Sequence, residues 1–219
     1  FAWIEFEHSY IDLRGVMAHI LALRGTQTAA IVRVAWNDPV LLKPVLDMAP
    51  AAVVVPMIRS AAEARQAVEA CKYPPEGNRG FGPMRNMFGI DSMEEYLRIA
   101  GDQIMIFVQI EHIDAVNDLD AILQVPGLDG IVLGRNDLSG SMGILGQAQN
   151  PKLLEVIDTV FAKTRQAEKF LGVSIGPNLD TVREWAQKGV QWFALGEECG
   201  HILDGSKAIV DAVRKIDGS

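Results

Sequence analysis

The sequence predicts an α/β fold, a TIM-like (β/α)8 barrel that forms a single domain over residues 1–219. Three observations lead to this prediction. Apolar runs of strand length alternate with amphipathic runs of helix length, which is typical of a parallel sheet with crossover helices. Acidic residues follow two of the apolar runs, where a parallel barrel has its functional mouth. The alternative, an open doubly wound sheet, is disfavoured because the chain has no glycine-rich dinucleotide-binding turn.

The individual elements follow from hydrophobic periodicity and length. Strands are predicted near residues 2–7, 29–34, 52–56, 104–111, 129–133, 170–175 and 191–195. Helices are predicted near residues 11–24, 39–48, 60–72, 92–100, 113–123, 151–168, 178–188 and 198–215. Because a barrel of this class has eight strands, we expect the first strand and helix to lie upstream of residue 1. The longest irregular segment, 73–91, is expected to be functional, as long loops in compact domains usually are.

Composition limits the function classes. The chain is 49% hydrophobic, with a formal net charge of −8 and a pI near 5.0. This acidic balance disfavours a nucleic-acid-binding protein, whose surface would be basic. No run approaches 18 apolar residues, so no membrane span is expected. Cys71 and Cys199 lack metal-ligand spacing, and two free thiols indicate a reducing compartment, for which the cytoplasm is the default.

The side chains of a strand alternate between its two faces, so each predicted strand has a face that points into the barrel. In the fourth strand the even-numbered aliphatic residues pack outward, while Gln109 and Glu111 point inward at the C-terminal end. The same reasoning places Glu5 inward on the first strand and Arg33 inward on the second. His8 lies where the first strand leaves the barrel.

Inward charges are costly unless they pair with one another or bind a ligand. One interpretation is a structural ion-pair network that plugs the barrel. We favour a functional site, because these charges lie at the C-terminal strand ends, where barrel enzymes place their catalytic groups. Glu111 and Asp137, the latter in a glycine-led loop after the fifth strand, form a candidate site for a hard divalent cation.

Absent motifs narrow the chemistry further. The chain has no P-loop, no His-Glu-x-x-His pair and no Gly-x-Ser-x-Gly elbow. A Schiff-base enzyme needs a lysine at the C-terminal end of a barrel strand. The lysines lie in or beside predicted helices, except Lys169, which precedes a strand. Carbonyl chemistry would therefore need a metal ion as its electron sink.

Several motifs occur together in the order and at the spacing of a known family. They are Glu7-His8, Val32-Arg33 followed by Trp36-Asn37-Asp38-Pro39, Val55-Pro56-Met57, Tyr73-Pro74-Pro75-Glu76-Gly77-Asn78-Arg79-Gly80, Gln109-Ile110-Glu111 and Asn136-Asp137-Leu138-Ser139. The chain thereby resembles the HpcH/HpaI aldolase family of the phosphoenolpyruvate/pyruvate superfamily over essentially its whole length. The resemblance implies a class II, divalent-metal-dependent aldolase. Such a carbon–carbon lyase reversibly cleaves 4-hydroxy-2-oxo acids to pyruvate and an aldehyde via a metal-bound pyruvate enolate.

The resemblance also implies roles for the residues at the mouth. Glu111 and Asp137 would hold Mg²⁺ or Mn²⁺, with Co²⁺ also compatible. Arg33 would stabilise the enolate oxygen, and Gln109 would brace the same region.

Further roles concern the substrate and the protons. The backbone N–H groups of Arg135 and Asn136 would bind the pyruvate carboxylate. His8 would transfer protons, and Asp47 from a neighbouring subunit would complete a His–Asp dyad. The resemblance thus implies a homo-oligomer, expected to be a hexamer.

Two positions depart from the family pattern. Members commonly have Asp three residues before the histidine, whereas this chain has Glu5, on the expected aldehyde side of the substrate. The loop commonly reads Gly-Pro-x-Asp, whereas Arg135 replaces the proline here, and an extra cation there could favour a diacid. These departures leave open an oxaloacetate decarboxylase resembling macrophomate synthase, or an acyl-CoA lyase. A non-enzyme alternative is a barrel that binds a metal and an oxo acid without turnover.

Overall fold

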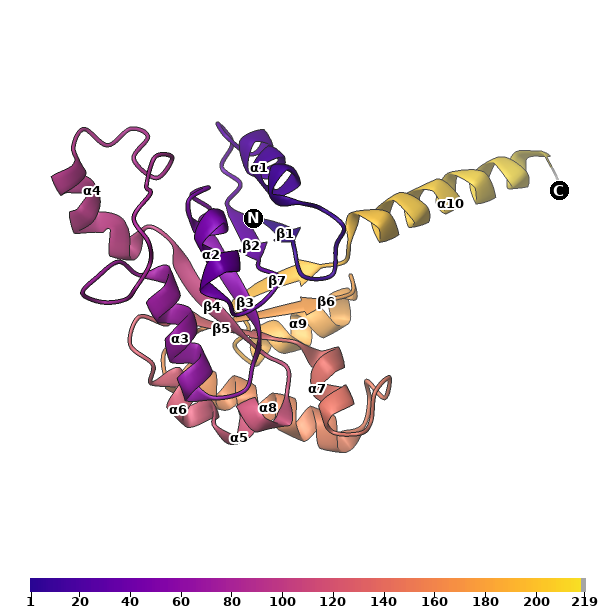
Figure 1. Ribbon diagram of the computed structural model, residues 1–219. Helices are drawn as coiled ribbons and strands as arrows, with labels where there is room; N and C mark the ends of the chain where they lie inside the picture. Colours follow the sequence, from indigo (N-terminus) through magenta and orange to yellow (C-terminus); the bar gives the residue numbers. More distant parts are fainter. Residues whose placement is uncertain (218–219) are drawn as a thin grey trace.

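A computed structural model of the protein describes residues 1–217 (Figure 1). Seven parallel strands form one sheet in the order β1-β2-β3-β4-β5-β6-β7, each paired with the next strand in sequence. The sheet curls so far that the two edge strands share aromatic contacts: the rings of Phe1 and Trp3 lie 5.5 and 6.1 Å from that of Trp192. The predicted barrel architecture is therefore confirmed as a nearly closed, seven-stranded parallel barrel.

The strands are β1 (Ala2–Glu5), β2 (Ala30–Arg33), β3 (Ala52–Ile58), β4 (Met105–Ile110), β5 (Gly130–Leu133), β6 (Phe170–Ile175) and β7 (Trp192–Leu195). The α-helices are α1 (Leu13–Ala22), α2 (Pro39–Leu46), α3 (Ala61–Cys71), α4 (Met93–Ile99), α5 (Ile113–Asn117), α6 (Leu119–Leu123), α7 (Arg135–Ser141), α8 (Pro151–Gln166), α9 (Leu179–Gln187) and α10 (Glu198–Asp217). A short 3-10 helix, η1 (Ala100–Asp102), follows α4.

Local chemistry explains where most helices begin. Side chains at the N-caps of α1, α2, α3, α4, α8 and α9 accept hydrogen bonds from first-turn N–H groups, which would otherwise be unpaired. Two sequence predictions were wrong in detail. The helix predicted over 113–123 is divided into α5 and α6 at Asp118, and the glycine-led loop after β5 forms α7 instead.

The alternation of strand side chains divides the apolar core into two layers, as predicted. One layer lies between the sheet and the helices and includes Ile4, Val32, Ile106, Val108 and Ile110. The other fills the barrel interior with Ile31, Ala52, Val54, Phe107 and Val132. These interior residues occupy the lower part of the barrel, and the polar residues described below occupy its C-terminal mouth.

The indole of Trp192 closes the interior on the β6–β7 side. It packs edge-on against Phe107, with ring centroids 5.2 Å apart. It also covers Gly172 of β6 so closely that a Cβ atom at this glycine would overlap the ring. The absence of a side chain at Gly172 thus leaves space for a large aromatic side chain from the neighbouring strand.

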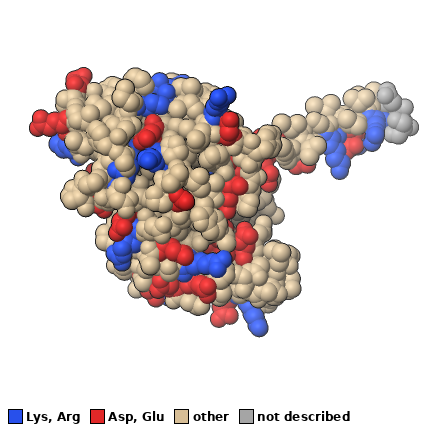
Figure 2. Space-filling view, in the orientation of Figure 1, with Lys and Arg blue, Asp and Glu red and all other residues tan. Residues whose placement is uncertain are grey.

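The helix α10 differs from the others because it projects away from the barrel (Figure 1). Its exposed side chains include Ile202, Leu203, Ile209, Val210 and Val213. In Figure 2 the arm carries broad uncharged areas between scattered acidic and basic side chains. Although α10 is 20 residues long, no helix among residues 1–217 is both long enough and apolar enough to cross a membrane.

We predict that Gly172→Ala destabilises the barrel by about 1–3 kcal/mol, because the added methyl group must displace the Trp192 indole. Thermal or urea unfolding measures this loss. Gly176→Ala is the matched control, since a Cβ there meets no atom within 4 Å. Equal stability of the two variants would contradict the proposed packing role of Gly172.

Candidate active site

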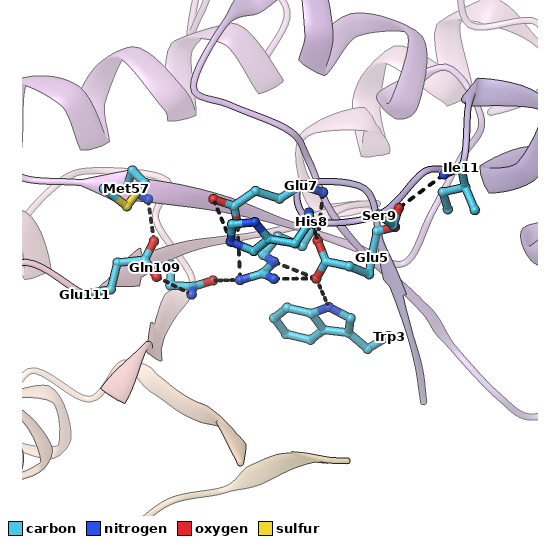
Figure 3. A network of polar contacts seen from close by, with 10 residues as sticks. Trp3, Glu5, Glu7, His8, Ser9, Ile11, Met57, Gln109 and Glu111 are labelled. Carbon is cyan, nitrogen blue, oxygen red and sulfur yellow. Dashed lines mark hydrogen bonds and ion pairs between the residues drawn. The ribbon is translucent and has the colours of Figure 1, made fainter. Parts of the chain in front are cut away.

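The candidate site lies at the C-terminal ends of the strands, where the barrel opens. Glu5 is the last residue of β1, and Arg33 is the last residue of β2, in register beside it. Gln109 lies in β4, Glu111 follows that strand directly, and Asp137 lies in α7 after β5. The predicted inward orientation is confirmed by the contacts that connect the first four of these side chains (Figure 3).

Arg33 is the centre of this network. Its Nε and Nη2 atoms lie 2.7 and 2.5 Å from Glu5 Oε2, and its Nη1 atom lies 3.1 Å from Glu7 Oε2. Nη1 also donates a 3.4 Å hydrogen bond to Gln109 Oε1. The guanidinium carbon lies 5.6 Å from the centre of the Trp3 ring. Contacts with β1, with the segment just after it and with β4 therefore fix the guanidinium in one orientation.

The pKa values of Glu5 and Glu7, the two glutamates beside Arg33, are shifted in opposite directions. Burial raises the pKa of Glu5, but hydrogen bonding and the positive charge of Arg33 outweigh it, so the net pKa is lowered. For Glu7, burial dominates over the charges of Arg33 and His8, and the pKa is raised. Glu7 Oε2 is buried and lacks a hydrogen bond of good geometry, although it lies beside Arg33. Glu7 follows β1 by two residues and was not among the predicted site residues.

Glu111 is held in the wall of the mouth and is only 2% exposed. Its Oε1 accepts a 2.7 Å hydrogen bond from the Met57 N–H group, and its Oε2 accepts a 2.6 Å hydrogen bond from Gln109 Nε2. Gly134 stands directly beside it: a Cβ at this position would lie 2.5 Å from Glu111 Oε2 and 2.9 Å from Gln109 Nε2. A glycine is therefore required for the carboxylate to take this position.

The Met57 N–H group reaches Glu111 because β3 is irregular. The pairing of β3 with β4 shifts between Val55 and Ile58, and Met57 has a φ of 56°, in the left-handed region that a methionine seldom adopts. This bulge turns one backbone donor toward the mouth. The sequence signal was Pro56, since proline inside a strand is typical of a bulge.

Negative charge exceeds positive charge around Glu111. Burial, together with the charges of Glu7 and Asp137, raises the pKa of Glu111 to about 7, although the Met57 hydrogen bond and Arg33 oppose this shift. Asp137 is exposed, so it can face a ligand that enters from solvent. A bound cation would neutralise this excess of carboxylates, and perturbed groups of this kind are typical of functional sites.

The donor set fits a hard divalent cation. Mg²⁺ commonly binds one or two carboxylates and completes its coordination with water and substrate oxygen atoms. Within residues 1–217, no three or more His, Cys, Asp and Glu side chains gather as an all-protein metal site would require. The chemistry of Glu111 and Asp137 is therefore compatible with a water-rich Mg²⁺ or Mn²⁺ site and not with a closed structural site such as that of zinc.

His8 follows β1 at the rim of the mouth, and its side chain is 68% exposed. Its Nε2 atom lies 3.7 Å from Glu7 Oε1. Asp47 lies elsewhere, after the end of α2, where Arg79 Nη2 donates a 2.7 Å hydrogen bond to its carboxylate. No ion pair between His8 and Asp47 is present in the described part of one chain, so a dyad of these two residues requires a second subunit.

Arg79, in the long irregular segment 73–91, is buried. The residue is 5% exposed, and its guanidinium carbon lies 4.6 Å from the centre of the Tyr73 ring. The pairing with Asp47 could not be read from the sequence, because the two residues are separated by 32 positions and a loop.

The residues predicted to bind the substrate carboxylate begin α7. Arg135 and Asn136 form its first turn after Gly134, which provides no side-chain cap, so N–H groups at this end are available to a ligand. The Arg135 guanidinium, unlike these backbone N–H groups, lies beside Trp185 of α9. Its carbon lies 6.0 Å from the ring of Trp185, a residue of the core between sheet and helices.

Comparison with known proteins agrees with this geometry. A family model described as HpcH/HpaI aldolase/citrate lyase matches residues 3–204. The 4-hydroxy-2-oxo-heptane-1,7-dioate aldolase of Shigella sonnei is 34% identical over 212 residues, which cover 95% of this chain and 80% of that protein. The 5-keto-4-deoxy-D-glucarate aldolase of Klebsiella pneumoniae is 32% identical over 219 residues, covering 98% of this chain and 84% of that protein.

Solved structures show the same similarity. The HpcH/HpaI aldolase from Desulfitobacterium hafniense has a TM-score of 0.89 at 26% identity, with 97% of this chain and 82% of that chain covered. Macrophomate synthase has a TM-score of 0.86 at 24% identity, with 100% and 79% covered, which shows a shared fold. From the match over residues 3–204 and these relatives, the chain belongs to the HpcH/HpaI aldolase/citrate lyase family of carbon–carbon lyases.

Proposed function

We propose that this protein is a divalent-metal-dependent aldolase that reversibly cleaves 4-hydroxy-2-oxo acids to pyruvate and an aldehyde. The observation that carries the proposal is the fixed guanidinium of Arg33 beside the Glu111 and Asp137 carboxylates at the open end of the barrel. Two relatives at 32–34% identity bear the names of oxo-acid aldolases, which supports this substrate class.

The cation held by Glu111 and Asp137 would act as a Lewis acid that polarises the 2-oxo group and orients the adjacent carboxylate. The chain supplies the remaining interactions. Arg33 donates to the C2 oxygen as negative charge develops there, and Gln109 keeps both Arg33 and Glu111 in place. The first-turn N–H groups of α7, from Arg135 and Asn136, bind the substrate carboxylate.

Cleavage requires one proton to leave the C4 hydroxyl group and another to reach C3. When the hydroxyl proton leaves, the C3–C4 bond breaks, the aldehyde departs and the electron pair passes toward the C2 oxygen. His8 at the rim serves as the proton carrier, since imidazole ordinarily exchanges protons near neutral pH. Asp47 of a neighbouring subunit would orient this imidazole, and Glu5 would lie on the aldehyde side of the substrate.

The same proposal includes a homo-oligomer. An isolated helix that projects into solvent is only marginally stable in water, and the apolar stripe of α10 has no partner within its own barrel in the described residues. We propose that a second copy of this chain covers the stripe, in an assembly of closed symmetry.

We predict that Glu111→Gln and Asp137→Ala each weaken Mn²⁺ binding strongly and abolish turnover, because each removes one of the two carboxylates proposed to hold the cation. Calorimetry with Mn²⁺ and a coupled pyruvate assay measure the two effects. Glu155→Ala, on the exposed face of α8, is the control and should keep both. Full activity of either site variant, or of the parent protein after complete removal of metal with EDTA, would refute the assignment.

Arg33→Lys is expected to lose turnover by about 10²-fold or more, because lysine keeps the charge but cannot reproduce the planar set of donors. The measurement is kcat, with the melting temperature recorded alongside. If the variant retains its kcat but melts at a lower temperature, Arg33 serves mainly as a structural ion-pair partner of the half-buried Glu5 and Glu7.

For His8→Ala we expect Mn²⁺ affinity to be unchanged, because the imidazole is exposed and is not required as a ligand. Aldol cleavage should fall by roughly 10²–10⁴-fold. Oxaloacetate decarboxylation at the same site should fall less, since loss of CO2 requires no base. A loss of metal affinity, or equal slowing of both reactions, would assign His8 another role.

Ile209→Asp should reduce the molecular mass in sedimentation experiments, because it introduces a charge into the apolar stripe of α10. Ala208→Asp places the same charge one residue away, on the other side of the helix, and should leave the assembly intact. A parent protein that sediments as a monomer at micromolar concentration would contradict the oligomer and the role of Asp47 together.

A further inference from the structure

A cavity of about 410 Å³ lies at the opposite end of the barrel from the candidate active site. Its lining includes Ala30 at the start of β2, Ala51 just before β3 and Ile104 just before β4, so it sits at the N-terminal ends of these strands. The end of α1 and the segment 73–91 form its outer wall. The proposed aldolase chemistry, at the C-terminal mouth, makes no use of this cavity.

Two arginines from separate parts of the chain line this cavity. Arg24 follows α1, and Arg85 lies in the long irregular segment. Their guanidinium carbons lie 5.3 and 5.9 Å from the centre of the same aromatic ring, that of Phe88. Each guanidinium is attracted to the ring by a cation–π contact, and both arginines line the cavity, where an anion can meet them.

The arginines lack anionic partners among residues 1–217. Neither makes an ion pair with a carboxylate there, and no aspartate or glutamate of the described residues lines the cavity. The Arg85 Nε atom is buried and has no hydrogen-bond acceptor. In a chain with a net charge of −8, a cavity lined by two arginines and by no carboxylate of the described residues is electrostatically suited to an anion.

Asn86 indicates a second feature of the ligand. This lining residue is 6% exposed, and its Nδ2 atom donates to the Leu46 carbonyl oxygen at 3.1 Å, which fixes the orientation of the amide. Its Oδ1 atom is buried and receives no hydrogen bond. A ligand that satisfies this acceptor must carry a donor, such as a hydroxyl group, in addition to its negative charge.

We propose that this cavity binds a small oxyanion that bears a hydroxyl group, such as a phosphate monoester or a hydroxycarboxylate. Arg24 and Arg85 contact the anionic group, and Asn86 Oδ1 accepts from the hydroxyl. Guanidinium groups bind phosphate and carboxylate oxygens through paired hydrogen bonds, and both guanidiniums contact the Phe88 ring in the wall of the cavity. The site is separate from the metal and oxo-acid site.

Calorimetry on the full-length, metal-free protein tests the proposal, with glycerol 3-phosphate as the probe at constant ionic strength. We expect saturable binding that weakens at least tenfold in Arg85→Gln and in Arg24→Gln. Arg65→Gln is the matched control, because Arg65 is exposed on α3 and makes no ion pair among the described residues. Glu111→Gln should also retain binding, which separates this test from any failure of the proposed aldolase site.

Sulfate tests the role of Asn86, because it carries two negative charges but no hydroxyl donor. It should bind at least several-fold more weakly than glycerol 3-phosphate. The absence of saturable binding at 10 mM probe, as an order-of-magnitude limit set by weak anion affinity, would overturn the proposal, as would equal losses in all three arginine variants. So would a change of sedimentation in Arg85→Gln without any anion binding by the parent, because the arginines would then contact a second copy of the chain.

Discussion

Two glutamates at the barrel mouth, the half-buried Glu7 and the buried Glu111, set the constraint on which the surrounding structure depends. A carboxylate that is removed from water must be protonated, hydrogen-bonded or paired with a cation. Arg33 compensates one side of the mouth through Glu5 and Glu7. The Met57 N–H group and Gln109 secure the other side, but they add no positive charge. The residual negative charge is the physical basis for a cation site there.

The features of this mouth that depend on strand periodicity could be predicted from the sequence. Alternation has a strict period of two, so an error of one residue would have reversed every assignment. The inward orientation of Glu5, Arg33 and Gln109 was therefore a firm inference once β1, β2 and β4 were located. The aliphatic runs located them, and the two separate core layers confirm the result.

The remaining features depend on tertiary structure that periodicity does not encode. The Met57 donor arises from a bulge, and proline marks a bulge without stating which N–H group will turn. The helix α7 was interpreted as a loop because Gly134, Gly140 and several polar residues are typical of loops, yet Leu138 anchors it in the core. Arg79 is buried because Asp47 and Tyr73 meet it there, and such long-range pairs leave no local signal.

Asp47 and His8, the two residues of the proposed dyad, lie at opposite ends of the barrel. Because Asp47 follows α2 and precedes β3, it lies at the N-terminal end of the strands, whereas His8 lies at the C-terminal mouth. In the proposed assembly, a dyad of these residues would bring the mouth of one subunit against the opposite end of another. Met48, Ala49 and Pro50, directly after Asp47, line the arginine cavity. An anion in that cavity would therefore sit next to the segment that carries Asp47 to the neighbouring mouth.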